Sequence, residues 1–270
     1  MTKSEILLRH ESEESFHDHW ASTLNVDELL VKETFEAPTA VENEYALKQL
    51  GELKGKKLLD LGCGAGEASV YFALKGAHVT ACEISSKLVE IVKKLAVRFN
   101  VDVNVLKMEA EKLKFLDESF DLVYGNGVLH HVCLDPALIE VHRILKPGGT
   151  AIFIEPLAYN PAIKVYRRLA KLVRTPMETP LTFQDIDTMK NLFAQVRHRE
   201  FGFLTLYIFV HYYFVQRIDP SKERYWKRLI SKSESHKALF NILKKGDDLL
   251  LKVAPFLRRY CWNTVLVLTK

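Results

Sequence analysis

Nearly continuous apolar runs recur along the first 155 residues, and most are followed by a turn and a helical segment. The runs 57–61 (KLLDL) and 77–82 (AHVTAC) have the composition of parallel strands that are buried on both faces. This alternation predicts an α/β protein with a doubly wound sheet. We expect strands near residues 57–61, 78–82, 102–106, 120–124 and 150–155, and helices near residues 67–75, 86–99 and 135–145.

The segments on either side of this core are less regular. Residues 1–34 predict an amphipathic helix with Trp20 and Leu24 among its apolar contacts, and residues 40–53 predict a second helix. After residue 156 we expect a basic helix at 159–173, a proline-bounded loop at 175–180, a helix at 182–193, a sixth strand near 196–203 and a last strand at 262–269.

The turn after the first strand carries the most chemical information. Glycines at positions 62, 64 and 66 leave room for a ligand to approach the backbone. The second strand ends at Glu83, about 20 residues later, where doubly wound folds present an acid to the hydroxyl pair of a ribose. The pattern therefore predicts a nucleotide-type ligand.

Asp60 narrows the choice of ligand. It lies at the end of the first strand, two residues before Gly62. A carboxylate there repels a phosphate but attracts a sulfonium or an amino group. The residues favour S-adenosylmethionine over a dinucleotide.

Four motifs, in this order along the chain, resemble those of the class I S-adenosylmethionine-dependent methyltransferases. They are LDLGCGAGE (59–67), EAEKLKF (109–115), FDLVYGNGVLHHV (120–132) and LKPGG (145–149). The resemblance covers about residues 36–158 and is closest to the ubiquinone/menaquinone-methylase-like (methyltransferase type 11) group. It departs from the family pattern at Glu109, where an Asp is usual, and at Lys114, where a Pro is usual.

The resemblance implies S-adenosylmethionine as cofactor and suggests which residues bind it. It assigns Asp60, Gly62, Cys63, Gly64 and Gly66 to the cofactor turn, Glu83 and Ile84 to the ribose, Glu109 and Ala110 to the adenine, and Asn126 to the methionine portion. Glu109 has the same charge as the usual Asp, so we still expect it to contribute to adenine binding.

The same resemblance organises the chain into three parts. We expect a Rossmann-like core of seven strands, formed by residues 54–204 and 260–270 and preceded by a helical cap, 1–53. In a minimal class I methyltransferase the last two strands form a short hairpin. Here residues 205–259 intervene, and we expect this insertion to be a helical lid or substrate element.

Composition adds constraints on compartment and partners. The four cysteines are scattered without C-x-x-C pairs, so we expect a reducing compartment and no metal site. The charged N-terminus lacks the apolar core of a signal peptide, which favours a cytoplasmic protein. Residues 1–158 hold 17 Lys/Arg and 25 Asp/Glu, whereas residues 159–270 hold 21 and 9. A basic C-terminal part suits an anionic partner, although solvated helical faces explain it equally well.

The insertion mixes aromatic and basic residues. The run FGFLTLYIFVHYYF (201–214) leads into it and is too short to span a bilayer as a helix. Three interpretations stay open: peripheral contact with an anionic membrane, a pocket for an aromatic or lipid-like acceptor, and simple packing on the core.

Candidate catalytic residues follow the fourth strand. His130 and His131 lie at the carboxyl edge of the predicted sheet, where open α/β folds bind ligands, and either one is a candidate base. His211, Tyr212 and Tyr213 are alternatives from the start of the insertion. Glu155, at the end of the fifth strand, is a candidate for orienting the acceptor.

The absence of one motif argues against nucleic acid as the methyl acceptor. The tetrapeptide after the fourth strand is YGNG (124–127) rather than N/D-P-P-Y/F, which argues against methylation of nucleic-acid bases. The sequence therefore favours methyl transfer to a small, hydrophobic or lipid-like acceptor at O, N or C. The rival hypothesis is a non-catalytic binding module of the same fold that contacts a membrane or nucleic acid through its basic region.

Overall fold

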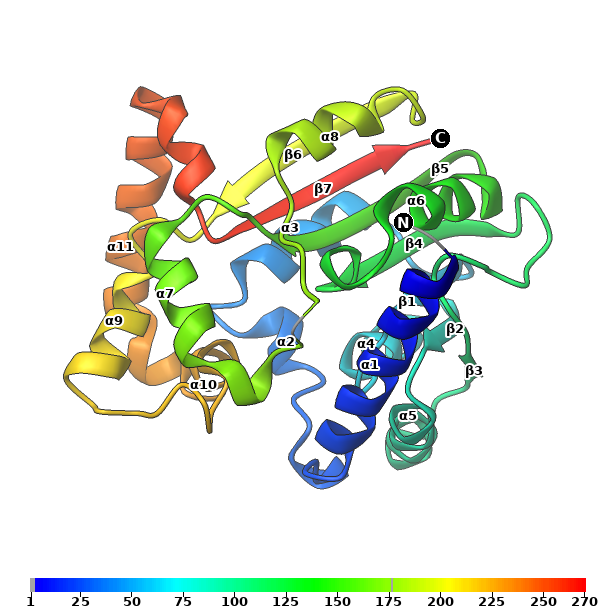
Figure 1. Cartoon of the computed structure of the whole chain (residues 1–270), viewed down its shortest axis with the longest axis horizontal. Coiled ribbons are helices and arrows are strands. Elements are labelled where there is room, and N and C mark those ends of the chain that lie inside the picture. Colours follow the sequence, from blue (N-terminus) through cyan, green and yellow to red (C-terminus); the bar gives the residue numbers. More distant parts are fainter. Residues whose placement is uncertain (1–2, 176) are drawn as a thin grey trace.

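A computed structural model describes residues 3–175 and 177–270, and it shows a seven-stranded sheet covered by helices (Figure 1). The strand order is β3-β2-β1-β4-β5-β7-β6, in which β7 alone runs antiparallel to its neighbours β5 and β6. The strands are β1 (Lys57–Leu61), β2 (His78–Glu83), β3 (Val103–Lys107), β4 (Phe120–Asn126), β5 (Leu145–Pro156), β6 (Gln195–Phe201) and β7 (Asn263–Thr269). The predicted Rossmann-like α/β fold is confirmed.

Helices fill the connections between the strands. The α-helices are α1 (Lys3–Ala21), α2 (Glu33–Glu36), α3 (Val41–Leu50), α4 (Glu67–Leu74), α5 (Ser86–Arg98), α6 (Leu134–Ile144), α7 (Pro161–Leu169), α8 (Phe183–Met189), α9 (Tyr207–Phe214), α10 (Tyr225–Ser231) and α11 (Ser233–Val253). Short 3-10 helices are η1 (Val26–Glu28), η2 (Leu129–His131), η3 (Lys171–Val173) and η4 (Pro255–Tyr260).

The period-two alternation of the strands separates two apolar cores. Leu58, Ile152 and Val265 point to the face covered by α3, α4 and α5. Leu59 and Phe153, on the opposite face, pack against α6 and α8. Because both faces of the central strands are buried, their sequences are almost wholly apolar.

The N-terminal segment differs from its prediction. The expected helix over 1–34 is interrupted after Ala21, and α1 buries a polar face that includes Arg9 and Glu13. Trp20 and Leu24 pack against the core as expected. Residues 1, 2 and 176, which fall within the predicted first helix and the 175–180 loop, lie outside the described part of the chain.

The insertion is helical and packs against the end of the sheet. Figure 1 shows α9, α10 and α11 gathered with α7 on one side of the molecule, beyond the carboxyl end of β5. Phe209, Tyr212 and Tyr225 form the centre of a separate apolar cluster there, which also contacts Trp262 before β7. Across the described residues, none of the helices combines the length and apolarity needed to cross a bilayer.

A buried carboxylate fixes the start of the insertion. Asp247, on α11, is 6% exposed and accepts hydrogen bonds from the amides of Leu204 (2.6 Å), Phe203 (3.3 Å) and Thr205 (3.3 Å). These three amides belong to neither a helix nor a strand, so no backbone carbonyl of a regular element accepts their hydrogen bonds. The Asp247 carboxylate is the acceptor instead.

We expect Asp247→Ala to lower the free energy of unfolding by about 1–3 kcal/mol, because it leaves buried amides without an acceptor. Urea denaturation of the full chain measures the change. Asp248→Ala is the matched control, since Asp248 is half-exposed and its ion pairs with Arg199 and Lys244 lie at the surface. Equal effects of the two substitutions would contradict the structural role of Asp247.

Candidate functional site

The turn between β1 and α4 is built from glycines with left-handed backbones. Gly62 and Gly66 have φ angles of 64° and 87°. A Cβ atom at Gly62 would lie 2.5 Å from Cγ2 of Val128, and one at Gly66 would lie 2.8 Å from Cγ1 of Val92. Backbone conformation and packing therefore both require glycine at these two positions.

Glu83 connects the end of β2 to this turn. Its carboxylate is 6% exposed and accepts hydrogen bonds from the amides of Gly64 (3.0 Å), Ile84 (2.8 Å) and Ser85 (3.1 Å). The acid that the sequence assigns to a ribose is thus held rigidly beside the glycine turn. Its place at the carboxyl edge of the sheet is the one expected for that role.

Asp60 is a buried carboxyl at the same edge. Ser69 donates a hydrogen bond to it at 2.5 Å, and its side chain faces the cavity described below. Burial, reinforced by the negative charges of Glu83 and Glu67, raises the pKa of Asp60 to about 7. A cationic group bound beside it would favour the ionised form.

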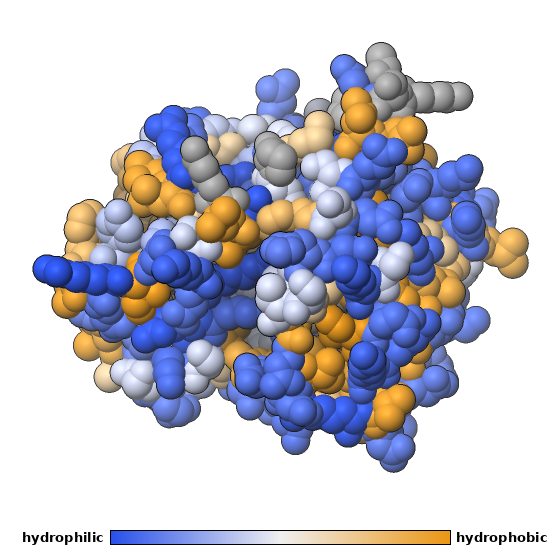
Figure 2. Space-filling view, turned by 60° about the horizontal axis from the view of Figure 1, so that its bottom comes forward, coloured by the Kyte–Doolittle hydropathy of each residue, from blue (hydrophilic) through white to orange (hydrophobic). Residues whose placement is uncertain are grey.

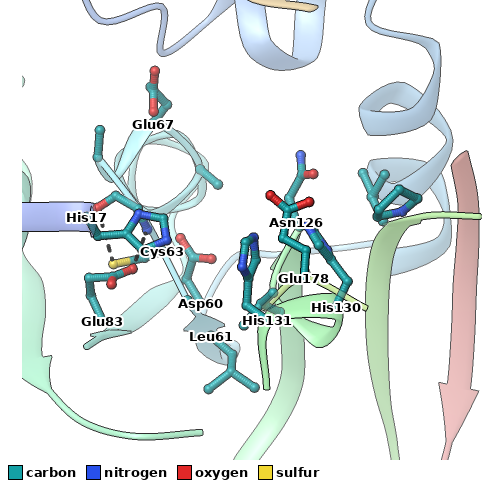
Figure 3. A pocket seen from close by; sticks show the side chains of 18 of the residues that line it. His17, Asp60, Leu61, Cys63, Glu67, Glu83, Asn126, His130, His131 and Glu178 are labelled. Atoms are coloured by element: carbon teal, nitrogen blue, oxygen red, sulfur yellow. Dashed lines mark hydrogen bonds between the residues drawn. The ribbon is translucent and has the colours of Figure 1, made fainter. Parts of the chain in front are cut away.

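A cavity of about 360 Å³ opens over the carboxyl ends of β1, β2, β4 and β5. This volume falls in the range of small-molecule sites, about 300–1,000 Å³. Figure 3 shows Asp60, Asn126, His131 and Glu178 around the same open space. On the molecular face in Figure 2, hydrophobic side chains form separate groups between hydrophilic ones.

Most residues that the sequence assigns to the cofactor line this cavity. They are Asp60, Gly62, Cys63, Gly64, Glu83, Ile84, Glu109, Ala110 and Asn126. Gly66 does not line it and instead packs against Val92. Burial raises the pKa of the Cys63 thiol, so this side chain stays neutral.

Two segments far apart in the sequence close the cavity above the glycine turn. The Trp20 ring of α1 approaches the Cβ position of Gly64 to 3.9 Å. The Arg224 guanidinium, at the start of α10, stacks on the same ring at 4.0 Å from its centroid. Burial lowers the pKa of Arg224 to about 10, so it remains charged at neutral pH. The insertion therefore contributes directly to the cavity wall.

His130 is held by a buried carboxylate. Its Nδ1 lies 2.7 Å from Oε2 of Glu155, and the other oxygen of Glu155 accepts the amides of Val128 (2.9 Å) and Leu129 (2.7 Å). Glu155 does not line the cavity, but it orients the histidine that does. This pairing has the geometry of an imidazole oriented to accept a proton.

His131 has a different environment. Its ring lies 4.0 Å from that of His130, and its Nδ1 is 3.1 Å from both the Thr175 hydroxyl and the Glu13 carboxylate. Burial, with the neighbouring His130, lowers the pKa of His131 to about 4. It is therefore neutral near pH 7.

The alternative catalytic residues from the insertion do not reach the site. His211, Tyr212 and Tyr213 are not among the residues lining the cavity. Tyr212 is fully buried in the insertion cluster, where its hydroxyl lies 3.1 Å from Nε2 of His236. Tyr213, by contrast, is 38% exposed at the surface of the insertion, so the structure does not bring these candidates to the cavity.

Other residues that line the cavity were not predicted from the sequence. Glu13 and His17 reach it from α1, and Glu178 comes from the loop before α8. The only local signal was the i, i+4 spacing of Glu13 and His17, which places both on one face of a helix.

Comparisons with known proteins agree with this geometry. A family model described as a methyltransferase domain matches residues 59–153. Ubiquinone biosynthesis O-methyltransferase of Alkalilimnicola ehrlichii is 37% identical over 122 residues, which cover 44% of this chain and 48% of that protein. Demethylmenaquinone methyltransferase of Chlorobaculum tepidum is 36% identical over 125 residues, covering 46% and 50%. The solved structure of YcgJ from Bacillus subtilis shares the fold, with a TM-score of 0.53, 17% identity, and coverage of 84% of this chain and 96% of that one.

The match identifies a methyltransferase domain in residues 59–153, and the sheet order and the glycine turn agree with the class I, S-adenosylmethionine-dependent fold. The matched segment is similar in sequence to ubiquinone and demethylmenaquinone methyltransferases. The chain spans about half the length of the two curated relatives. The family match ends at residue 153, so α7 to α11 lie beyond it.

Because the pKa of Asp60 is about 7, we expect the affinity for S-adenosylmethionine to depend on pH. The cationic cofactor prefers the ionised carboxylate, which is the minor form below pH 7. Affinity should therefore rise about tenfold between pH 6 and pH 8 and then level off. Calorimetric titration across this range measures it.

Asp60→Asn is the control for this pH dependence, since the amide does not titrate. Its affinity should be lower and flat between pH 6 and pH 8. A wild-type affinity that does not change with pH would show that the ionisation of Asp60 does not affect cofactor binding.

Proposed function

We propose that this chain transfers the methyl group of S-adenosylmethionine to a hydroxyl of a small, hydrophobic, quinol-like acceptor. The observation that carries the proposal is the single cavity that joins the glycine turn to the buried His130–Glu155 pair. The cofactor and a proton-accepting group thus face the same space.

The part of the proposal that concerns the cofactor is supported by the turn between β1 and α4. The glycines admit the ligand, Glu83 is placed for the ribose hydroxyls, and Asp60 for a positive charge. Glu109 and Ala110 would contact the adenine, and Asn126 would lie beside the methionine portion. Methyl transfer is an in-line displacement at the sulfonium methyl, for which alignment and exclusion of water are the main requirements.

The acceptor half supports oxygen as the methylated atom. A hydroxyl must lose its proton as the new bond forms, whereas a neutral amine can attack the methyl group first and lose its proton afterwards. His130, oriented by Glu155, is the residue we assign to accept that proton. The acceptor oxygen attacks the methyl carbon as the carbon–sulfur bond breaks, which leaves S-adenosylhomocysteine and the methyl ether.

The wall contributed by the insertion supports a hydrophobic acceptor. Trp226, Leu229 and Ile230 of α10 line the cavity together with Trp262. We propose residues 205–259 as the substrate element, attached to the Rossmann-like core 54–204 and 260–270. One curated relative is named for ubiquinone biosynthesis and the other for methylation of demethylmenaquinone, and both names agree with such a pocket.

His130→Gln tests the proposed base. We expect kcat for methyl transfer to a demethylated quinol to fall about 10²- to 10⁴-fold, with little change in cofactor affinity. Mass spectrometry of the methylated product and calorimetry measure the two quantities. His78→Gln, at the exposed start of β2, is the control. An unchanged kcat would remove His130 from proton transfer.

Glu83→Ala should weaken S-adenosylmethionine binding by about 1–3 kcal/mol, because a charged acceptor in the cofactor turn is lost. The exposed Glu90, on α5, provides the control Glu90→Ala. Equal affinities in folded Glu83→Ala and wild type would exclude Glu83 from cofactor binding. Absence of cofactor binding in the wild type would instead favour the non-catalytic binding module.

Peripheral membrane contact is a second proposal, supported by the end of α9. Phe214 and Val215 are 72% and 65% exposed and are followed by Arg217 and Lys222. Phe214→Glu should reduce co-sedimentation with phosphatidylserine-rich vesicles, whereas Leu116→Glu, at an equally exposed site, should not. If the fraction of protein that co-sediments depends neither on lipid charge nor on Phe214, the membrane contact is excluded.

A further inference from the structure

Three side chains from distant parts of the sequence meet at one wall of the cavity. Glu13 and His17 lie one turn apart on the polar face of α1, and His131 is the last residue of η2, which follows β4. One ligand atom from each of the three lies within 4.8 Å of the others. Oε2 of Glu13 is 3.1 Å from Nδ1 of His131 and 3.6 Å from Nε2 of His17.

Three polar atoms of this cluster lack a hydrogen bond within the described residues. Glu13 is only 4% exposed, yet neither of its carboxylate oxygens has a hydrogen bond of acceptable geometry in the described structure. Nδ1 of His17 is likewise buried without a hydrogen bond. Burying a carboxylate in this way is costly unless a positive charge compensates it.

We propose that Glu13, His17 and His131 bind a divalent transition-metal ion such as Zn²⁺. Ligand atoms about 2.0–2.1 Å from a tetrahedral ion lie roughly 3.3 Å from one another, close to the separations around Oε2 of Glu13. Two imidazoles and one carboxylate leave a coordination position open, as catalytic metal sites do. The Thr175 hydroxyl, 3.1 Å from Nδ1 of His131, is a further oxygen beside the site.

A second arrangement of ligands shares His131 but is less suitable. His130, His131 and Glu178 also have ligand atoms within 4.8 Å of one another. Glu178, however, forms ion pairs with Arg167 (2.6 Å) and Arg174 (2.8 Å). These partners already neutralise Glu178, so the uncompensated charge lies at Glu13.

The location gives the ion a use in the proposed function. All three ligands line the cavity that holds the His130 ring, so an open coordination position there would face the acceptor. A bound divalent ion lowers the pKa of a hydroxyl that it coordinates, which assists deprotonation. This use depends on the proposed methyl transfer, whereas binding of the ion does not.

The test is titration of chelator-treated full-length protein with Zn²⁺ by calorimetry and with Co²⁺ by visible absorption. We expect one ion per chain, with a Co²⁺ spectrum typical of low coordination number, and no comparable binding of Mg²⁺, which prefers oxygen ligands. His17→Gln and Glu13→Gln should each weaken binding by more than about tenfold, since replacing even a residue that only hydrogen-bonds to a metal ligand costs about 10- to 100-fold.

His19→Gln is the matched control, because His19 is exposed on the same helix. The thermal midpoint of each metal-free variant shows whether it folds, and the two ligand variants are independent of each other. Cofactor titration in the presence of chelator separates this site from the proposed function. A protein that binds S-adenosylmethionine but no stoichiometric ion, or variants that bind Zn²⁺ as tightly as the wild type, would overturn the proposal.

Discussion

The hydrogen bond from the Gly64 amide to the Glu83 carboxylate joins the first turn of the sheet to the second strand, and the cavity geometry depends on it. The parallel register pairs Leu61 with Cys82, so the turn after β1 and the acid ending β2 emerge side by side. Because the glycine backbone fixes the direction of the amide, the carboxylate is held at one position. Asp60 lies beside it, and its burial, reinforced by the negative charge of Glu83, raises its pKa to about 7.

Local patterns predicted the parts of the molecule that local forces determine. The strands, the glycine turn and Glu83 lie within one βαβ unit, so spacing along the sequence reports their spacing in space. The interruption after Ala21 and the polar buried face of α1 were missed. That face is stabilised by distant partners, such as the Met177 carbonyl that accepts a 2.6 Å bond from Arg9.

The candidate site shows the same limit more sharply. Glu13 and His17 meet His131 only because α1 packs across the carboxyl edge of the sheet, a contact between residues more than 100 positions apart. Conversely, the sequence allowed Tyr212 as a catalytic residue, but its side chain is fully buried inside the insertion. Residues assigned by motif were placed at the cavity, whereas residues supplied by the flanking segments required the tertiary structure.

The stack of Arg224 on Trp20 has a consequence for the cavity wall. It connects the N-terminal helix to the insertion directly above the glycine turn, so a ligand in that turn is enclosed by two chain segments 200 residues apart. A cation–π contact contributes only about 0.5–2 kcal/mol. A contact of that strength can break without unfolding either helix, so the wall above the turn is weaker than the sheet edge below it.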